Sequence, residues 1–258
     1  IMKNISFLVA MPRSGNTIFA SIMNQNPNVA VTPNSITLEI TKDIFLLKET
    51  DVFKNYPDHK SLDNVLNGVF DSYYKDWPQQ YIIDRGPVTT TGNMMLIKKH
   101  LEQPLKCVVL LRSMADVIAS FVKLYVKENY KPELTMEQKI SELVNVNGGL
   151  VKSLMALQEI MKPENKHMAC FVHYDDLVSN PEKEINKIYK FLNIPEFKHD
   201  FKNISQLKVN DLSYNDSVYI NNLHTLRTDG VSKENNPYYD LIPQRFIDKY
   251  KHITFKDI

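Results

Sequence analysis

Residues 12–17, Pro-Arg-Ser-Gly-Asn-Thr, place one glycine, one arginine and three polar side chains in a single short loop. The apolar run before them, residues 5–10, predicts a strand, and the helical spacing of apolar residues after them predicts a helix. A loop at a helix N-terminus presents unpaired backbone N–H groups and the positive end of the helix dipole, which together bind anions, most often phosphate. The loop is therefore a candidate anion site; the alternative is a tight turn that carries a surface arginine.

Each side chain of this loop has a part in such a site. Gly15 lets the backbone approach the anion, and Arg13 adds a fixed positive charge. Further donors would come from Ser14, Asn16 and Thr17. The nucleotide-binding pattern G-x-x-x-x-G-K-[ST] has a lysine where Asn16 stands, and that lysine contacts the β- and γ-phosphates. The absence of this lysine argues against ATP or GTP chemistry, but it is compatible with phosphate binding.

The loop resembles the 5′-phosphosulfate loop of sulfotransferases, P-[RK]-S-G-[TN]-T, which binds 3′-phosphoadenosine 5′-phosphosulfate (PAPS). Because it reads Pro-Arg-Ser-Gly, it is most similar to the tyrosylprotein and bacterial branches of that family. The resemblance implies that PAPS is bound through this loop and that no metal is required. The residues that it assigns to cofactor binding here are Arg13, Ser14, Gly15, Asn16 and Thr17.

Two later segments extend the resemblance as far as residue 195. In sulfotransferases a strand ends in an arginine, a helix carries a serine eight residues later, and the pair holds the 3′-phosphate of the cofactor; Arg112 and Ser120 match these positions. An arginine offers a planar fork of donors to such a dianion, and a serine adds one hydrogen bond. The segment 173–181, followed by 190–192, resembles the family pattern Y-E-D-L-x-x-x-P…F-L, which would place Tyr174 near the adenine. A tyrosine at a strand end can equally belong to the core.

The catalytic residues implied are Arg13, Arg85 and Glu39. Arg13 would stabilise the charge that develops on the bridging oxygen of the leaving phosphate, as the mechanism of phosphoryl transfer suggests by analogy. Arg85 resembles the lysine that precedes a proline in the family, although it could instead pair with Asp84. No histidine stands where cytosolic members have their general base. Glu39 is the carboxylate nearest to the base position of tyrosylprotein members, with Asp84 the next choice; a solvated helix residue is the alternative for Glu39.

A basic segment near the C-terminus closes over the 3′-phosphate in the family. Arg227 and Lys233 are the matching candidates, and the match is loose. Both lie in residues 203–242, a polar stretch without recognisable secondary structure. Irregular segments of that length are usually functional or disordered.

Composition limits the possible partners. The 258 residues carry a net charge of +1, which produces no overall electrostatic attraction to nucleic acid. No apolar run reaches the length of a membrane span. With no membrane anchor recognised, the sequence predicts a cytoplasmic protein of one sulfotransferase domain over residues 1–258. Cys107 and Cys170 lie in apolar runs, where buried free thiols are expected; a disulfide is the alternative.

Alternating strand and helix patterns predict a three-layer α/β fold of the P-loop type, with a central parallel sheet of about four to five strands between helices. The strands are predicted at residues 5–10, 29–31, 81–85, 106–112 and 168–174. Helices are predicted from residue 35, with Ser35 as its cap, and over 61–76, 91–101, 181–192, one or two within 135–161, and one after 113 and one after 243. Residues 50–60 are expected to form a loop.

The function expected from these features is in-line transfer of a sulfuryl group from PAPS to a hydroxyl or amine, with release of 3′-phosphoadenosine 5′-phosphate (PAP). The alternatives are a P-loop kinase and a non-catalytic module that binds PAP or another phosphorylated ligand. The acceptor cannot be identified from the sequence: carbohydrate, peptide tyrosine, lipid and small phenols all remain open.

Overall fold

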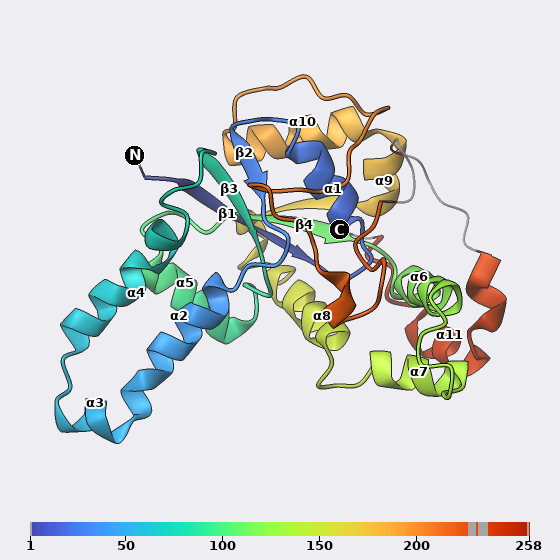
Figure 1. Cartoon of the computed structure of the whole chain (residues 1–258), viewed down its shortest axis with the longest axis horizontal. Helices are drawn as coiled ribbons and strands as arrows, with labels where there is room; N and C mark the ends of the chain where they lie inside the picture. Colours follow the sequence, from blue (N-terminus) through green and yellow to red (C-terminus); the bar gives the residue numbers. More distant parts are fainter. Residues whose placement is uncertain (1, 227–230, 232–236, 257) are drawn as a thin grey trace.

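Five parallel strands form the central sheet of the computed structural model, which describes residues 2–226, 231, 237–256 and 258 (Figure 1). Their order across the sheet is β2-β3-β1-β4-β5. The strands are β1 (Asn4–Ala10), β2 (Val29–Val31), β3 (Tyr81–Arg85), β4 (Cys107–Leu111) and β5 (Ala169–His173). The predicted α/β fold with a parallel sheet is confirmed, and so are the five predicted strand positions.

Helices cover both faces of the sheet, as predicted. The larger ones are α1 (Asn16–Met23), α2 (Thr37–Leu46), α4 (His59–Tyr73), α5 (Thr91–His100), α6 (Met114–Lys127), α8 (Gly149–Ile160) and α10 (Pro181–Leu192). Shorter ones are α3 (Asp51–Asn55), α7 (Met136–Leu143), α9 (Tyr174–Ser179) and α11 (Gln244–Tyr250), with 3₁₀ turns at Leu47–Glu49, Lys166–Met168, Asp216–Val218 and Pro237–Leu241. In Figure 1, α10 lies on one side of the sheet and α8 on the other.

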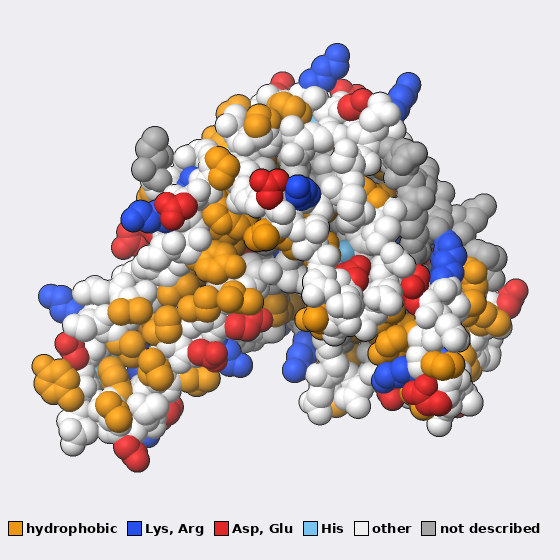
Figure 2. All heavy atoms as spheres, viewed as in Figure 1, with side chains coloured by type: hydrophobic (Ala, Val, Ile, Leu, Met, Phe, Trp, Pro, Cys, Tyr) orange, Lys and Arg blue, Asp and Glu red, His pale blue; other side chains and the backbone are white. Residues whose placement is uncertain are grey.

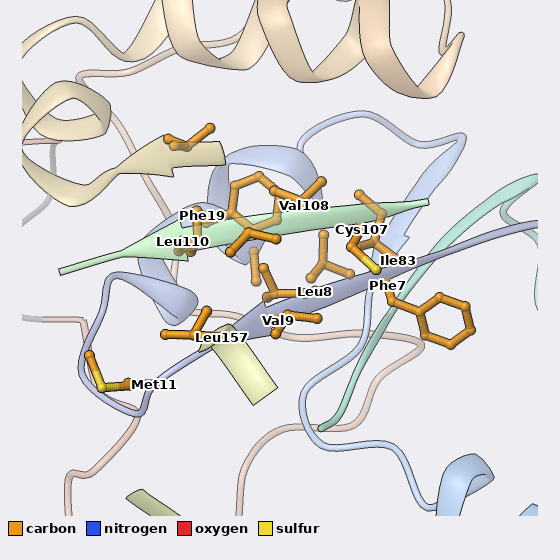
Figure 3. Packing of buried hydrophobic residues seen from close by; sticks show 14 of the residues in the cluster. Phe7, Leu8, Val9, Met11, Phe19, Ile83, Cys107, Val108, Leu110 and Leu157 are labelled. Atoms are coloured by element: carbon orange, nitrogen blue, oxygen red, sulfur yellow. The ribbon is translucent and has the colours of Figure 1, made fainter. Parts of the chain in front are cut away.

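The core forms where the helices on the two faces of the sheet pack against β1 and β4. All five residues of β4 are buried, which is why its sequence is a continuous apolar run with no polar alternation. Phe19 of α1 and Leu157 of α8 approach β1 and β4 from opposite sides (Figure 3). Cys107 and Cys170 are free and buried, as predicted, and burial raises the pKa of their thiols to about 12 and about 11.

The order of the strands fixes where a ligand can bind. β1 lies between β3 and β4, so the chain leaves β1 toward one side of the sheet and later crosses to the other side. In open parallel sheets, the crevice outside the carboxyl ends of strands at such a switch point is the usual ligand site. The loop after β1, Arg85 at the end of β3 and Arg112 after β4 all lie at this edge.

Two local predictions were wrong in the segment after β2. Residues 50–60 are not all loop, because α3 begins after the cap Thr50, whose side chain accepts from the N–H of Phe53, and α4 begins after the cap Asp58. Ser35 does not cap α2; the helix begins at Thr37, after Ile36, which is 56% exposed. The proline and polar residues of 50–60 suggested a loop, but the side chains of Thr50 and Asp58 cap the starts of two helices there.

The helices α2, α3 and α4 form an arm that extends from the sheet, at the lower left of Figures 1 and 2. Hydrophobic side chains gather on its surface (Figure 2). The large exposed ones are Ile36, Phe45, Leu46, Leu47, Val52, Tyr56, Val65 and Tyr73. The root of this arm borders the carboxyl edge of the sheet through the start of α2.

A buried polar cluster attaches the arm to β3. Asp84 is 2% exposed, and its Oδ2 atom accepts hydrogen bonds of 2.6 Å from the hydroxyl of Thr37 in α2 and 2.6 Å from that of Tyr74 after α4. Burial raises the pKa of Asp84, and burial followed by the nearby Asp84 charge raises that of Tyr74. One strand residue thus fixes the positions of both long helices of the arm.

Replacing Asp84 with alanine is expected to destabilise the protein. The change removes a shared acceptor from two buried hydroxyl groups. Both also contact Ser35 Oγ, at 2.8 Å from Thr37 and 3.2 Å from Tyr74, so the expected loss is about 1–3 kcal/mol in total. The free energy of unfolding, measured in urea, should fall accordingly, and Asp84→Asn, which keeps an acceptor oxygen, should lose less. Equal stability of Asp84→Ala and the wild-type protein would show that the cluster does not hold the arm.

Candidate active site

The loop after β1 adopts a backbone that an ordinary residue rarely takes. Gly15 has a φ angle of 91° and Arg13 one of 64°, both in the left-handed region, and α1 begins directly afterwards at Asn16 without a side-chain cap. A Cβ atom added to Gly15 would lie 2.8 Å from the ring of Tyr174. Glycine is therefore required here by both the backbone angle and the close approach of Tyr174.

Several buried polar atoms around this loop have no hydrogen-bond partner among the described residues. They are Ser14 Oγ, Asn16 Oδ1 and Arg112 Nε. Buried polar groups are almost always paired in folded proteins, so unpaired ones call for an explanation such as a ligand. The donor Arg112 Nε, together with the N-terminus of α1, suits an anion.

The predicted cofactor residues converge on one hollow at the carboxyl edge of the sheet. Its walls include Arg13, Gly15, Asn16, Thr17, Arg112, Ser120 and Tyr174. Arg85 also lines it, together with residues 223–226. Ser14 is fully buried. Arg227 and Lys233 lie outside the described residues.

Arg13, Arg112 and Ser120 belong to one hydrogen-bonded network. Arg112 Nη1 donates to the carbonyl oxygen of Arg13 at 2.6 Å, and Arg13 Nε donates to Ser120 Oγ at 3.1 Å. The guanidinium of Arg112 also lies 4.1 Å from the centroid of the Tyr174 ring, a cation–π distance. Three segments far apart in the sequence are thereby joined: the loop after β1, the end of β4 and α6.

Arg85 faces the same region from β3. Its Nη1 atom donates to the hydroxyl of Tyr214 at 2.8 Å and to the carbonyl oxygen of Pro33 at 3.4 Å. The Asp84 carboxylate instead binds Thr37 and Tyr74, so the alternative of an Asp84–Arg85 pair does not describe this structure. Being buried in that cluster, Asp84 is also poorly placed to accept a proton from a substrate.

Glu39 lies in a second hollow beside the first. It stands in the first turn of α2, with an exposed side chain, and the opposite wall is formed by Lys152, Ser153 and Ala156 of α8. Four residues line both hollows: Pro12, Arg85, Leu223 and His224. A group held on the anion loop and a second molecule beside Glu39 would therefore meet at these four residues.

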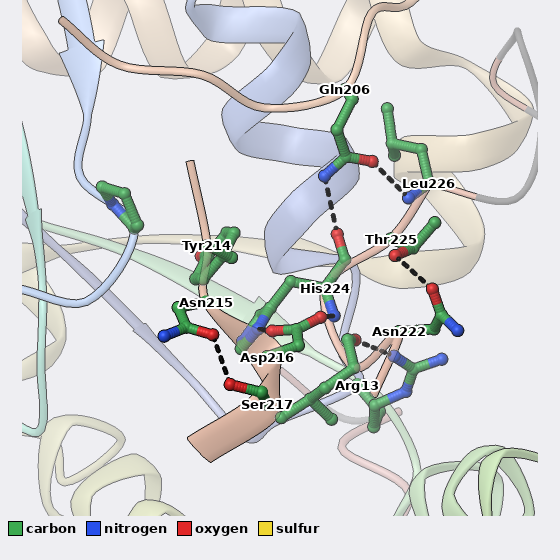
Figure 4. A network of polar contacts seen from close by, with 12 residues as sticks. Arg13, Gln206, Tyr214, Asn215, Asp216, Ser217, Asn222, His224, Thr225 and Leu226 are labelled. Atoms are coloured by element: carbon green, nitrogen blue, oxygen red, sulfur yellow. Dashed lines mark hydrogen bonds and ion pairs between the residues drawn. The ribbon is translucent and has the colours of Figure 1, made fainter. Parts of the chain in front are cut away.

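His224 is a site residue that the sequence did not indicate. Its Nδ1 atom lies 2.6 Å from Asp216 Oδ1, its backbone N–H donates to Asp216 Oδ2 at 2.8 Å, and its ring stacks on Tyr214 at 3.7 Å (Figure 4). Burial lowers the pKa of His224, as do the charges of Arg85 and Arg13, whereas the hydrogen bond to Asp216 opposes them. The length of the irregular segment was the only sequence signal of a functional role, because no motif links His224 to Asp216.

Metal and membrane features are absent from the part of the chain that the structure describes. No group of three or more His, Cys, Asp or Glu side chains within it could hold a metal ion. None of the helices described is long and apolar enough to cross a bilayer.

A family profile described as "Sulfotransferase domain" matches residues 3–239. The chain belongs to the sulfotransferase family. A search of curated protein sequences finds no match. Among solved structures, the sulfotransferase domain of the Synechococcus PCC 7002 olefin synthase is similar at a TM-score of 0.54 and 16% identity, over 99% of this chain and 91% of that one. The sulfotransferase domain of the curacin biosynthetic pathway is similar at 0.51 and 17%, over 100% and 93%.

At these identities the structural likeness supports the fold alone, and the profile establishes the family. This sulfotransferase is therefore an enzyme that uses PAPS as its sulfuryl donor, as the sequence predicted, and the kinase alternative is set aside. The buried Nε atom of Arg112, for which the described residues provide no hydrogen-bond partner, fits an anionic group of PAPS.

Replacing Gly15 with alanine is expected to destabilise this sulfotransferase and weaken PAP binding. The left-handed backbone alone costs about 1–2 kcal/mol for an L-residue, and the new Cβ atom must displace Tyr174. Gly92→Ala is the matched control, because a Cβ atom there meets nothing within 4 Å. Unfolding in urea and the thermal shift with PAP measure the two effects. If Gly15→Ala behaved like Gly92→Ala in both, the strain assigned to this loop would be refuted.

Proposed function

We propose that the enzyme holds the 5′-phosphosulfate of PAPS on residues 12–17 and the 3′-phosphate between Arg112 and Ser120. The transferred sulfuryl group then passes to a hydroxyl or amine of an acceptor beside Glu39. The observation that carries this assignment is the buried Nε atom of Arg112, which has no hydrogen-bond partner in the part of the chain that the structure describes and belongs to a network with Arg13 and Ser120. PAPS supplies an activated sulfuryl group whose leaving phosphate gathers negative charge during transfer.

The loop side of the site supplies positive charge and donors. Arg13, the amides that begin α1, and the side chains of Asn16 and Thr17 surround the place proposed for the phosphosulfate. Ser14 is fully buried. Donors fixed before the reaction stabilise developing charge without having to reorganise. Tyr174 is proposed to lie near the adenine, with its ring already held by Arg112.

The acceptor side is defined by Arg85 and Glu39. Arg85 lines both hollows, so we propose that it stabilises the negative charge of the sulfuryl group during its transfer. Glu39 is proposed to contact the acceptor hydroxyl from the first turn of α2. Carbohydrate, peptide tyrosine, lipid and small phenols all remain candidate acceptors. The predicted single domain over residues 1–258 and the contribution of Arg227 and Lys233 stay predictions.

Ligand-induced stabilisation tests the cofactor assignment without an acceptor. A ligand at 100 times its Kd stabilises the folded state by about 2.7 kcal/mol. We expect PAP to raise the Tm of the wild-type enzyme well above the effect of adenosine 5′-phosphate or of ATP with Mg²⁺. Arg112→Ala should abolish the difference between PAP and adenosine 5′-phosphate, because it removes the partner of the 3′-phosphate.

Arg245→Ala is the matched control for this experiment. Arg245 is an exposed arginine of α11 that pairs with Glu137 and lines neither hollow, so PAP should stabilise that variant as it does the wild type. A preference for ATP with Mg²⁺, or an unchanged response of Arg112→Ala, would refute the assignment. Binding of PAP without any turnover over a broad acceptor panel would support the non-catalytic alternative.

A further inference from the structure

The wall shared by the two hollows contains one side chain that can accept a proton at neutral pH. Of the four shared residues, Pro12 and Leu223 are apolar and Arg85 stays protonated, which leaves His224. His224 is 8% exposed, so its ring is largely shielded from bulk water while it lines both hollows. Its position is where the oxygen of an acceptor would meet the sulfuryl group.

The hydrogen bonds of His224 select one tautomer. A carboxylate accepts and cannot donate, so the contact with Asp216 places the ring proton on Nδ1. The lone pair of the neutral ring is then on Nε2, for which the described residues provide no hydrogen-bond partner. Stacking on Tyr214 at an interplanar angle of 4° fixes the plane of the ring, and Arg85 in turn holds the hydroxyl of Tyr214.

Burial and two neighbouring arginines favour the neutral form of the His224 ring by lowering its pKa. Burial lowers its pKa, and the cations Arg85 and Arg13 lower it further, while Asp216 acts in the opposite direction. Tyr214 lies on one face of the ring, and Glu39 and Lys152 line the hollow on the acceptor side. A neutral imidazole is the form that can take a proton, and an imidazole is intrinsically a stronger base than a carboxylate.

We propose that His224 is the general base of the transfer and that Asp216 is its positioning residue, an inference that rests on the proposed function. The O–H bond of the acceptor breaks and its proton binds Nε2. The electron pair of that oxygen forms the new bond to sulfur as the bond from sulfur to the donor phosphate breaks, with its pair left on the phosphate oxygen. Glu39 contacts the acceptor without taking the proton.

Nitrogen NMR of the histidine side chains tests the geometry without any acceptor. We expect His224 in the enzyme–PAP complex to be neutral at pH 7 and protonated on Nδ1. Asp216→Asn should lower the pKa of His224, because the carboxylate that stabilises the imidazolium is lost, and Arg85→Ala should raise it. A ring protonated on Nε2 alone, or one that carries both protons at pH 7, would overturn the proposal.

Turnover of PAPS with water as the acceptor provides the second measurement. His224→Gln is expected to slow PAP release by about 10²–10⁴-fold, the usual contribution of a positioned base. The wild-type rate should fall as the pH drops through the pKa of His224; this acid limb should move to lower pH in Asp216→Asn and persist in Glu39→Gln. His252→Gln, at an exposed histidine that lines neither hollow, is the control.

The thermal shift with PAP separates two kinds of failure. If PAP does not stabilise even the wild-type enzyme, the proposed function fails. If PAP stabilises His224→Gln as it does the wild type, but that variant turns over at a rate within threefold of it, the cofactor site stands and the base assignment is overturned. If the rate of Glu39→Gln no longer fell at low pH, the general base would be the carboxylate of Glu39 instead of His224.

Discussion

One hydrogen bond across the carboxyl edge of the sheet holds the candidate site together. β1 and β4 are neighbouring parallel strands, so the loop that follows β1 and the arginine that follows β4 end at the same edge. Arg112 donates to the backbone carbonyl of Arg13 there, which ties the left-handed loop to the adjacent strand. The same arginine keeps a second donor, Nε, which is buried and has no hydrogen-bond partner among the described residues. A single side chain thus both shapes the anion loop and keeps a donor for a ligand.

The irregular segment 214–226 supplies the contacts of the candidate site that the strand ends do not. It supplies partners to two arginines: the carbonyl oxygen of Leu223 accepts from Arg13, and the hydroxyl of Tyr214 accepts from Arg85. It also brings the Asp216–His224 pair to the wall between the two hollows. Strand ends thus provide the arginines Arg85 and Arg112, while the segment 214–226 provides the paired Asp216 and His224.

Patterns over short distances were enough to predict most of the fold, and they named residues that the structure brings to one hollow. Apolar runs marked the strands, and the position of an arginine at a strand end placed Arg112 at the ligand edge, although the roles of these residues stay predictions. The pairing of Asp216 with His224 was beyond sequence reasoning, because it depends on how an irregular segment folds back over the sheet. The contact of Asp84 with Thr37 and Tyr74 was missed for the same reason, since it joins three elements through tertiary packing.

The two cysteines have a practical consequence for spectroscopy. Thiol reagents act on accessible thiolates, and both Cys107 and Cys170 are buried, with a pKa raised well above neutrality. A single cysteine introduced on the exposed arm, for example at Val52, would therefore take up a spin label or fluorophore selectively while the native thiols stay in place. Distances from such a label to a second one near α8 would report whether the arm moves relative to α8 when PAP binds.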